Sequence, residues 1–304
     1  MMRRWLATAG LLLCCSEAMA LKFKPMTDSE GRPVLAVYDC ARITEERKAG
    51  CQDHENSFTG PGKGYKGDAA VLEAMLRERG YYQVWLYSGG GNLDEGIRMG
   101  RVLRQHRQFT YVPKGFICVS ACTVAFLGGV LRDVAPGGAY EVHAYSGVKN
   151  WPPERLQRFV SAEGDVSLKN FVTESSDDGM IYAGRLFLYA QQMIGGQPDE
   201  ERTIEVLANS PDYAKDYLGS PRFRSDFAQM KAEGVGRAHE TLMRIERESF
   251  ETRLAHLKAH ADRLGERSAK AVRMLEIMFS SRIDGTAELD QNTLRQNGYI
   301  NVRR

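Results

Sequence analysis

The sequence predicts an α/β fold with a helical region added toward its C-terminus. Between residues 66 and 130, strand-like apolar runs alternate with stretches whose apolar residues recur at helical spacing. This alternation is typical of a parallel sheet with crossover helices. Residues 222–280 are rich in Glu, Arg, Lys, Ala and Leu in a helical pattern. The 304 residues are 43% apolar, enough for a packed core in one large domain or two small ones.

The first twenty residues have the organisation of a secretory signal. Two arginines precede a short apolar stretch, and Ala18-Met-Ala20 supplies the small residues of a cleavage site. We therefore expect cleavage after Ala20 and a periplasmic or secreted protein. Retention as an anchor or lipoprotein at Cys14 or Cys15 is the alternative. The position before either cysteine lacks the small residue that lipid-modification signals carry.

Four cysteines remain after the signal, an even number for an oxidising compartment. Cys40 and Cys51 bracket a polar loop that a disulfide would close. Cys118 and Cys122 are four residues apart, which can satisfy disulfide geometry if the backbone is helical there. Neither pair has histidines nearby in a zinc-ligand pattern, so we expect no metal.

The first half of the chain supplies the elements of the sheet in order. Residues 31–40 predict a strand, and the glycine-rich residues 41–66 predict a loop. That loop lacks the Gly-Lys-Ser/Thr ending of a phosphate-binding loop. Residues 68–77 then predict a helix and residues 81–87 the next strand. The latter ends in Ser88-Gly-Gly-Gly91, whose glycines permit positive φ and close approach to another group. A helix follows over residues 92–106.

Ser120 lies between an apolar run and a helical pattern of small residues, which predicts a strand breaking into a helix with a hydroxyl at the junction. Free N–H groups of that helix start would point at whatever the hydroxyl attacks. Residues 139–145 predict a strand that carries His143. Serine and histidine can supply nucleophile and base for acyl transfer. On local evidence alone, an N-cap serine and a structural histidine are more common.

These motifs resemble the Clp protease proteolytic subunit and its relatives in the Clp/crotonase superfamily. The 29 residues from Gly91 to Ser120 match the family's interval between oxyanion glycine and nucleophile, and the 23 residues to His143 are close to its next interval. The phrase Cys118-Val-Ser-Ala-Cys122, followed by Phe-Leu-Gly-Gly, is similar to a predicted-periplasmic branch. The resemblance covers roughly residues 66–146. The resemblance implies a crotonase-type spiral of β-β-α units. The alternation of strands and helices, taken alone, is equally compatible with a doubly wound sheet.

The resemblance implies that Ser120 is the nucleophile, His143 the base, and the N–H groups of Gly91 and Ala121 the oxyanion hole. It further implies a peptide or unfolded-protein substrate, a homo-oligomer and no cofactor. An ATPase partner is not expected, because exported compartments lack ATP. Gly89 replaces the proline of the family's Ser-Pro-Gly-Gly.

The C-terminal residues 289–301 are similar to the closing phrase of Clp-like chains. The family's third catalytic residue, an aspartate, lies three positions before the leucine, where this chain has Thr286. Asp284 and Glu288 are the nearest carboxylates. An alternative alignment at residues 217–218 would make Asp212 or Asp216 the candidate. The third catalytic residue is therefore open, and it is missing altogether in one interpretation.

The expected organisation is a signal peptide over residues 1–20, a Clp/crotonase-like domain over 21–221, a charged helical insertion over 222–283 and a C-terminal return to the core over 284–304. Within the domain, residues 146–176 are polar and predict a surface loop or lid, followed by a helix to about Ile194. Glycines at 234–236 and 265 interrupt the insertion. We expect the helical insertion to form a solvated outer layer or, alternatively, a surface for oligomerisation or for a partner.

The sequence thus predicts an exported serine peptidase. The alternatives are a non-catalytic binding or assembly module in the periplasm and, less compatible with export, an acyl-CoA enzyme. The net charge of +2, without a Lys/Arg cluster flanked by aromatic residues, gives no reason to expect a nucleic-acid partner.

Overall fold

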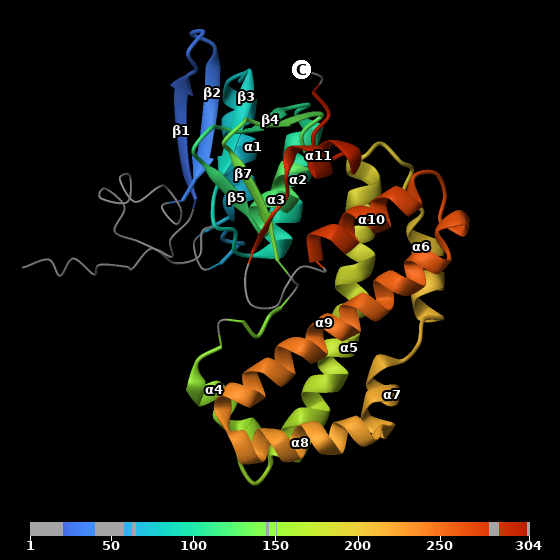
Figure 1. Ribbon diagram of the computed structural model, residues 1–304. Coiled ribbons are helices and arrows are strands. Elements are labelled where there is room, and N and C mark those ends of the chain that lie inside the picture. Colours follow the sequence, from blue (N-terminus) through green and yellow to red (C-terminus); the bar gives the residue numbers. More distant parts are fainter. Residues whose placement is uncertain are drawn as a thin grey trace, which may run out of the picture.

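Two sheets form the α/β part of the protein, the upper part in Figure 1. The computed structural model describes residues 21–39, 58–62, 65–143, 146–149, 151–279 and 286–302. The larger sheet has the order β1-β2-β3-β4-β6, formed by Lys22–Thr27, Pro33–Tyr38, Gln83–Tyr87, Phe109–Val112 and Leu131–Val134. Only β1 is antiparallel to its neighbour. The smaller sheet, β5-β7-β8, comprises Ile117–Val119, Ala139–Val142 and Ala287–Glu288.

From β4 to β7, successive strands alternate between the two sheets. β4 and β6 lie side by side in the larger sheet, and β5 and β7 pair in parallel in the smaller one. The two sheets meet at Ser88, directly after β3. Its N–H donates to the Ile117 carbonyl at 3.0 Å, and its carbonyl accepts from the Val119 N–H at 2.9 Å. The end of β3 is therefore held beside β5, the strand that leads to Ser120.

Three helices pack on these strands: α1 (Asp68–Glu78), α2 (Leu93–Gln105) and α3 (Ala121–Phe126). Asn92 caps α2, because its side chain accepts a hydrogen bond from the Glu95 N–H at 2.9 Å. A Cβ at Gly96 would lie 2.6 Å from the Ala121 carbonyl oxygen. Glycine at this position lets α2 approach the start of α3.

A helical lobe extends away from the sheets, below them in Figure 1. Its helices are α4 (Pro153–Val160), α5 (Gly164–Met193), α6 (Glu200–Ala208), α7 (Tyr213–Gly219), α8 (Pro221–Glu233), α9 (Val235–Ala259) and α10 (Ser268–Phe279), with a 3-10 turn at Ala261–Arg263. The chain then returns to the α/β part with β8 and α11 (Gln291–Gln296). There the Asn301 N–H donates to the Arg132 carbonyl at 3.0 Å.

Two hydrophobic cores organise the protein, and α5 and α9 each contribute to both. The N-terminal half of α5, with Leu168 and Phe171, packs in the core of the lobe. Its C-terminal half, with Phe187 and Tyr189, packs in the core of the α/β part. In α9, Leu242 belongs to the lobe core and residues from Phe250 onward to the α/β core. The two long helices therefore connect the cores continuously.

The organisation differs from the sequence expectation in three places. The expected loop at 146–176 contains α4 and the first half of α5. The helical region accordingly begins at Pro153 and not at residue 222, and the last strand before it ends at Val142. The edge strand β1 was not expected, because five of its six residues are exposed and it lacks an apolar pattern. The interruptions of the helical region were expected correctly: Gly234 separates α8 from α9, and Gly265, with a φ of 91°, lies between α9 and α10.

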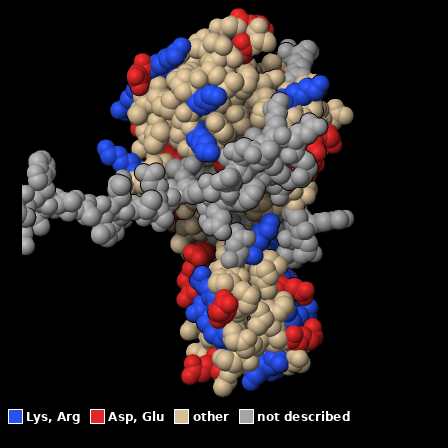
Figure 2. Space-filling view, turned by 90° about the vertical axis from the view of Figure 1, so that its left-hand side faces the viewer, with Lys and Arg blue, Asp and Glu red and all other residues tan. Residues whose placement is uncertain are grey.

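Charges of both signs are interspersed over the lobe (Figure 2). Several form ion pairs between helices, including Arg244 with Asp226 at 2.6 Å and Arg222 with Glu248 at 2.8 Å. Among the residues that the structure describes, none of the helices combines the length and apolar character needed to cross a bilayer.

Candidate functional site

Ser120 occupies a sharp turn between β5 and α3. Its backbone angles are φ 57° and ψ −124°, a conformation that glycine tolerates and residues with a Cβ rarely adopt. Hydrogen bonds hold the turn on both sides: the Ser120 N–H donates to the Glu141 carbonyl at 3.3 Å, and the Ser120 carbonyl accepts from the Thr123 N–H at 2.9 Å. A serine on a strained strand-to-helix turn is the arrangement of an exposed hydrolase nucleophile.

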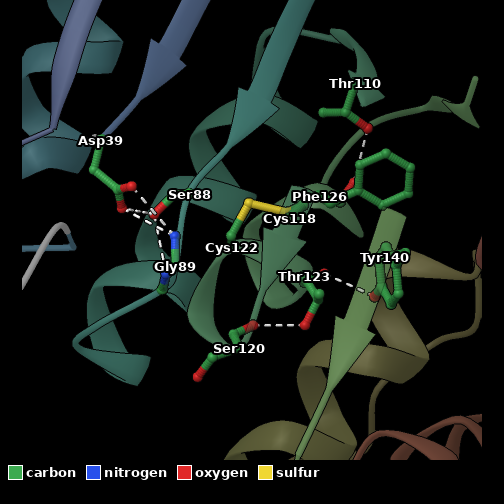
Figure 3. The surroundings of a disulfide bond; sticks show 11 residues. Asp39, Ser88, Gly89, Thr110, Cys118, Ser120, Cys122, Thr123, Phe126 and Tyr140 are labelled. Carbon is green, nitrogen blue, oxygen red and sulfur yellow. Dashed lines mark hydrogen bonds between the residues drawn. A yellow bond between two sulfur atoms is a disulfide. The ribbon is translucent and has the colours of Figure 1, made fainter. Parts of the chain in front are cut away.

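The Ser120 side chain does not cap α3, although it stands at the N-cap position. A capping serine would have an extended backbone and would accept a hydrogen bond from the first turn of the helix. In Figure 3 the side chain points away from Thr123 and the disulfide. Helix capping therefore does not explain the serine at this position.

The glycine turn at residues 89–91 is held by Asp39, which directly follows β2. The Asp39 carboxylate accepts hydrogen bonds from the Ser88 hydroxyl and, at 3.0 Å, from the Gly89 N–H (Figure 3). The Ser88 hydroxyl in turn accepts from the Gly90 N–H at 3.0 Å. Because Asp39 lies 49 residues before Ser88, no local sequence signal identified this contact.

The glycines bring this turn against the Ser120 turn. A Cβ at Gly90 would lie 2.6 Å from the Ser120 Cβ, and Gly90 has a φ of 102°. The N–H groups of Gly91 and Ala121 have no hydrogen-bond partner within the described part of the chain. Of the two residues assigned to the oxyanion hole, Gly91 is exposed and Ala121 is buried.

Gly91, Ser120 and His143 line one cavity of about 90 Å³. Its other walls are Leu93, Thr123, Val142, Ser146, Met278 and Phe279. Ala121 follows Ser120 directly but is not among the lining residues. The cavity thus brings together a hydroxyl, an imidazole and a glycine turn, and α10 supplies its apolar wall.

A disulfide between Cys118 and Cys122 spans the Ser120 turn, with Cα atoms 5.4 Å apart. We expected helical backbone between the two cysteines. Instead Cys118 lies in β5 and Cys122 in α3, and the sharp turn at Ser120 brings them together. Both residues are fully buried. The disulfide therefore ties the two arms of the turn to each other (Figure 3).

His143 directly follows β7, beside the C-terminal segment. In the register of β7 and β8, Val142 pairs with Ala287, so the next residues on the two segments are His143 and Thr286. Thr286 donates a hydrogen bond to the Glu141 carboxylate. Glu141 lies in β7, two residues before His143. The family resemblance did not identify this carboxylate.

The other candidates for the third catalytic residue are placed differently. Asp212 caps α7 by accepting from the Lys215 N–H at 3.1 Å, and Asp216 lies within that helix. Figure 1 shows α7 in the lobe, away from β7. Asp212 and Asp216 thus lie in the lobe and not beside β7. Asp284 lies outside the described residues.

Glu246 on α9 anchors the segment that follows His143. Its carboxylate accepts from the Ser146 hydroxyl at 2.8 Å and from the Val148 N–H at 3.2 Å. Burial, with a smaller contribution from the charge of Asp178, raises the pKa of Glu246 to about 7. Ser146 lines the cavity, so this partly buried acid contacts one of its walls.

Other expectations fall outside these contacts. The signal segment through Ala20 and the pair Cys40 and Cys51 lie outside the described residues. Within the described ranges, no group of three or more His, Cys, Asp or Glu side chains is arranged to hold a metal ion.

Comparisons with protein-family models, with curated proteins and with solved structures found no match to this chain.

Proposed function

We propose that this protein is an exported serine peptidase of the Clp/crotonase type, with Ser120 as nucleophile. The observation that carries the proposal is the strained turn at Ser120, a serine whose side chain does not cap α3. Ser120 lines the same cavity as His143 and Gly91. The division of successive strands between two sheets supports the spiral of β-β-α units.

Each residue has a defined role in the proposed reaction. Ser120 Oγ attacks the peptide carbonyl, and His143 takes the hydroxyl proton and passes it to the leaving amine. The N–H groups of Gly91 and Ala121 stabilise the oxyanion. Removal of one such donor typically lowers the rate on the order of a hundredfold or more.

We assign the orienting carboxylate to Glu141. It lies in β7, two residues before His143, and its hydrogen bond from Thr286 fixes one of its oxygens. Thr286, at the family's aspartate position, thus acts through a neighbouring acid. This role requires neither metal nor organic cofactor.

The substrate class in this proposal is a short or unfolded peptide in the periplasm or outside the cell, cleaved by a homo-oligomer without an ATPase. The apolar wall formed by Val142, Met278 and Phe279 supports uncharged side chains as the preferred residue next to the cleaved bond.

Fluorophosphonate labelling of the mature protein tests the proposal. The reagent should modify Ser120, and Ser120→Ala should remove both label and peptidase activity. Ser146→Ala is the matched control, because Ser146 lines the same cavity without standing on the strained turn. Folded protein that remains unlabelled, or label that persists in Ser120→Ala, would contradict the assignment.

A non-catalytic binding module is the second candidate, favoured by Thr286 at the family's aspartate position and by Gly89 in place of proline. It predicts that peptides bind with equal affinity to the unchanged protein and to Ser120→Ala, with no product formed. Equilibrium binding with product analysis separates the two functions.

A further inference from the structure

Leu21, the residue directly after the expected cleavage site, is buried beside an acid. It is 5% exposed and packs in the α/β core ahead of the exposed strand β1. Its backbone nitrogen donates a hydrogen bond to Asp68 Oδ1 at 3.2 Å. In the precursor this nitrogen belongs to a neutral peptide group. After cleavage at Ala20 it is an α-amino group, which is protonated near neutral pH.

Asp68 is a fully buried carboxylate that receives only neutral donors within the described residues. Besides Leu21 these are the Thr59 N–H at 2.6 Å and the Tyr65 hydroxyl. The neighbouring acid, Glu95, is buried as well and forms an ion pair with Arg98 at 2.5 Å. Burial and the charge of Glu95 raise the pKa of Asp68. Within the described residues, Glu95 thus has a cationic partner in Arg98, whereas the hydrogen-bond donors to Asp68 are all neutral.

We propose that cleavage of the Ala20–Leu21 bond creates an α-ammonium group that forms a buried ion pair with Asp68 and thereby fixes the catalytic glycine turn. The step is a hydrolysis: water adds across the peptide bond, Ala20 leaves as a carboxylate, and Leu21 retains the nitrogen as an ammonium group. A signal-peptidase-type endopeptidase supplies the catalysis. The ammonium compensates the buried negative charge that neutral donors leave unbalanced.

A short chain of contacts connects Asp68 to the oxyanion glycine. Asp68 Oδ2 accepts from the Thr59 N–H, and the preceding residue, Phe58, forms a bridge with the glycine turn. The Phe58 N–H donates to the Gly90 carbonyl at 3.0 Å, and the Phe58 carbonyl accepts from the Asn92 N–H at 2.9 Å. Holding Asp68 in its ionised, bonded state therefore holds Phe58 against the turn. This catalytic consequence rests on the proposed peptidase function, whereas the ion pair rests only on the proposed export and cleavage after Ala20.

A double-mutant cycle that combines retention of Ala20 with Asp68→Asn tests the ion pair. The protein beginning at Leu21 is compared with the same protein retaining Ala20, each with and without Asp68→Asn. With Asp68 present, retention of Ala20 should lower the melting temperature by at least about 5 °C, since breaking a buried ion pair is strongly destabilising. In Asp68→Asn, Ala20 should make no such difference. Asp28→Asn, at the turn between β1 and β2, is the control and should leave the difference intact.

Amine acylation gives a second measurement in case Asp68→Asn does not fold. At neutral pH the α-amine of the Leu21 form should resist acylation until urea is added, whereas the α-amine of the form retaining Ala20 should react at once. Equal melting temperatures with equal reactivity would overturn the proposal, as would an N-terminus other than Leu21 in the exported protein by intact mass.

Fluorophosphonate labelling then tests the link to the site. The rate at Ser120 should be at least tenfold lower when Ala20 is retained. Equal labelling rates would refute the coupling to the glycine turn. Absence of labelling in both forms, with the melting difference intact, would refute the peptidase and leave the ion pair established.

Discussion

At the scale of single residues, Ser120 carries a conformation that its own side chain disfavours. Backbone strain of this kind costs on the order of 1–3 kcal/mol and persists only where the surroundings determine it. Here the disulfide and the hydrogen bond to the Glu141 carbonyl hold the turn. A glycine would satisfy the backbone with less strain, so the serine is explained by its hydroxyl.

Replacing Ser120 should therefore separate stability from reactivity. We expect Ser120→Gly to be more stable than Ser120→Ala by about 1 kcal/mol. Glycine relieves the backbone strain of the folded state, and the greater entropy of glycine in the unfolded state offsets part of that gain. Both variants should lose fluorophosphonate labelling. Urea unfolding of the two variants under oxidising conditions measures the difference. A Ser120→Gly variant less stable than Ser120→Ala would show that the turn is not strained.

Substitution of Gly90 tests the close approach of the glycine turn to the Ser120 turn. A Cβ there would lie 2.6 Å from the Ser120 Cβ and 2.8 Å from the Val119 carbonyl oxygen. Gly90→Ala should lose roughly 2 kcal/mol or more of stability and most of the labelling at Ser120.

Gly31 provides the matched control for this substitution. It also has a positive φ, 77°, but a Cβ at Gly31 would meet nothing within 4 Å. Gly31→Ala should lose about 1 kcal/mol from backbone strain alone and should label normally. Equal labelling of Gly31→Ala and Gly90→Ala would contradict the close approach of the two turns.

At the scale of elements, α9 controls the segment that continues from β7 into the cavity wall. Glu246 accepts hydrogen bonds from Ser146 and Val148, and His239 on the same helix lies 3.2 Å from the Val148 carbonyl oxygen. Asp178 on α5 adds a repelling charge to the Glu246 carboxylate. The protonation of Glu246, a partly buried acid, is thereby linked to the packing of α9 against the site.

The pH dependence of stability tests this link. Because the folded pKa of Glu246 is raised to about 7 from 4.5, the folded state retains a proton between these values that the unfolded chain has lost. Stability should therefore fall as pH rises through this window, by at most about 3 kcal/mol from this group. Glu246→Gln should remove that component, as measured by urea unfolding at pH 4.5 and pH 8. The exposed Glu240→Gln should retain it; identical pH profiles for all three proteins would refute the assignment.

Local patterns predicted the elements around the site but not its long-range contacts. The glycine turn after β3 and the strand-to-helix junction at Ser120 were predictable because turn residues and apolar runs are local signals. Asp39 and Glu246 were not, since each contacts a residue 49 or more positions away. The start of α5 was missed because its polar residues, including Ser175 and Ser176, are buried between helices and interrupt the apolar pattern.

At the scale of the whole molecule, the two cores share their longest helices, so we expect them to unfold together. Trp85 lies in the larger sheet and Trp151 packs against the core of the lobe. These two are the tryptophans of the sequence beyond residue 20. Fluorescence of Trp85→Phe and of Trp151→Phe should report the same unfolding midpoint, within the small stability change of each substitution. Two clearly separated midpoints would show that the lobe unfolds on its own.

The α5–α9 contact between the cores gives a mutational test of the same idea. A Cβ at Gly179 would lie 2.5 Å from Ser249 Oγ and 3.2 Å from the Phe250 nitrogen. Gly179→Ala should therefore lower stability by about 1–2 kcal/mol and shift both tryptophan midpoints equally. Gly184→Ala, on the same helix, meets the movable Leu207 side chain and should be close to neutral.

The sharing of α5 and α9 also limits how this protein could be shortened. Deletion of residues 153–279 would remove the lobe together with the Phe187, Tyr189 and Phe250 rings that fill the α/β core, and with the cavity wall that α10 provides. The two sheets would be left with an open apolar surface, and the cavity would lose Met278 and Phe279 from its wall. A shortened protein that kept only the sheets would need replacement helices to cover the same face.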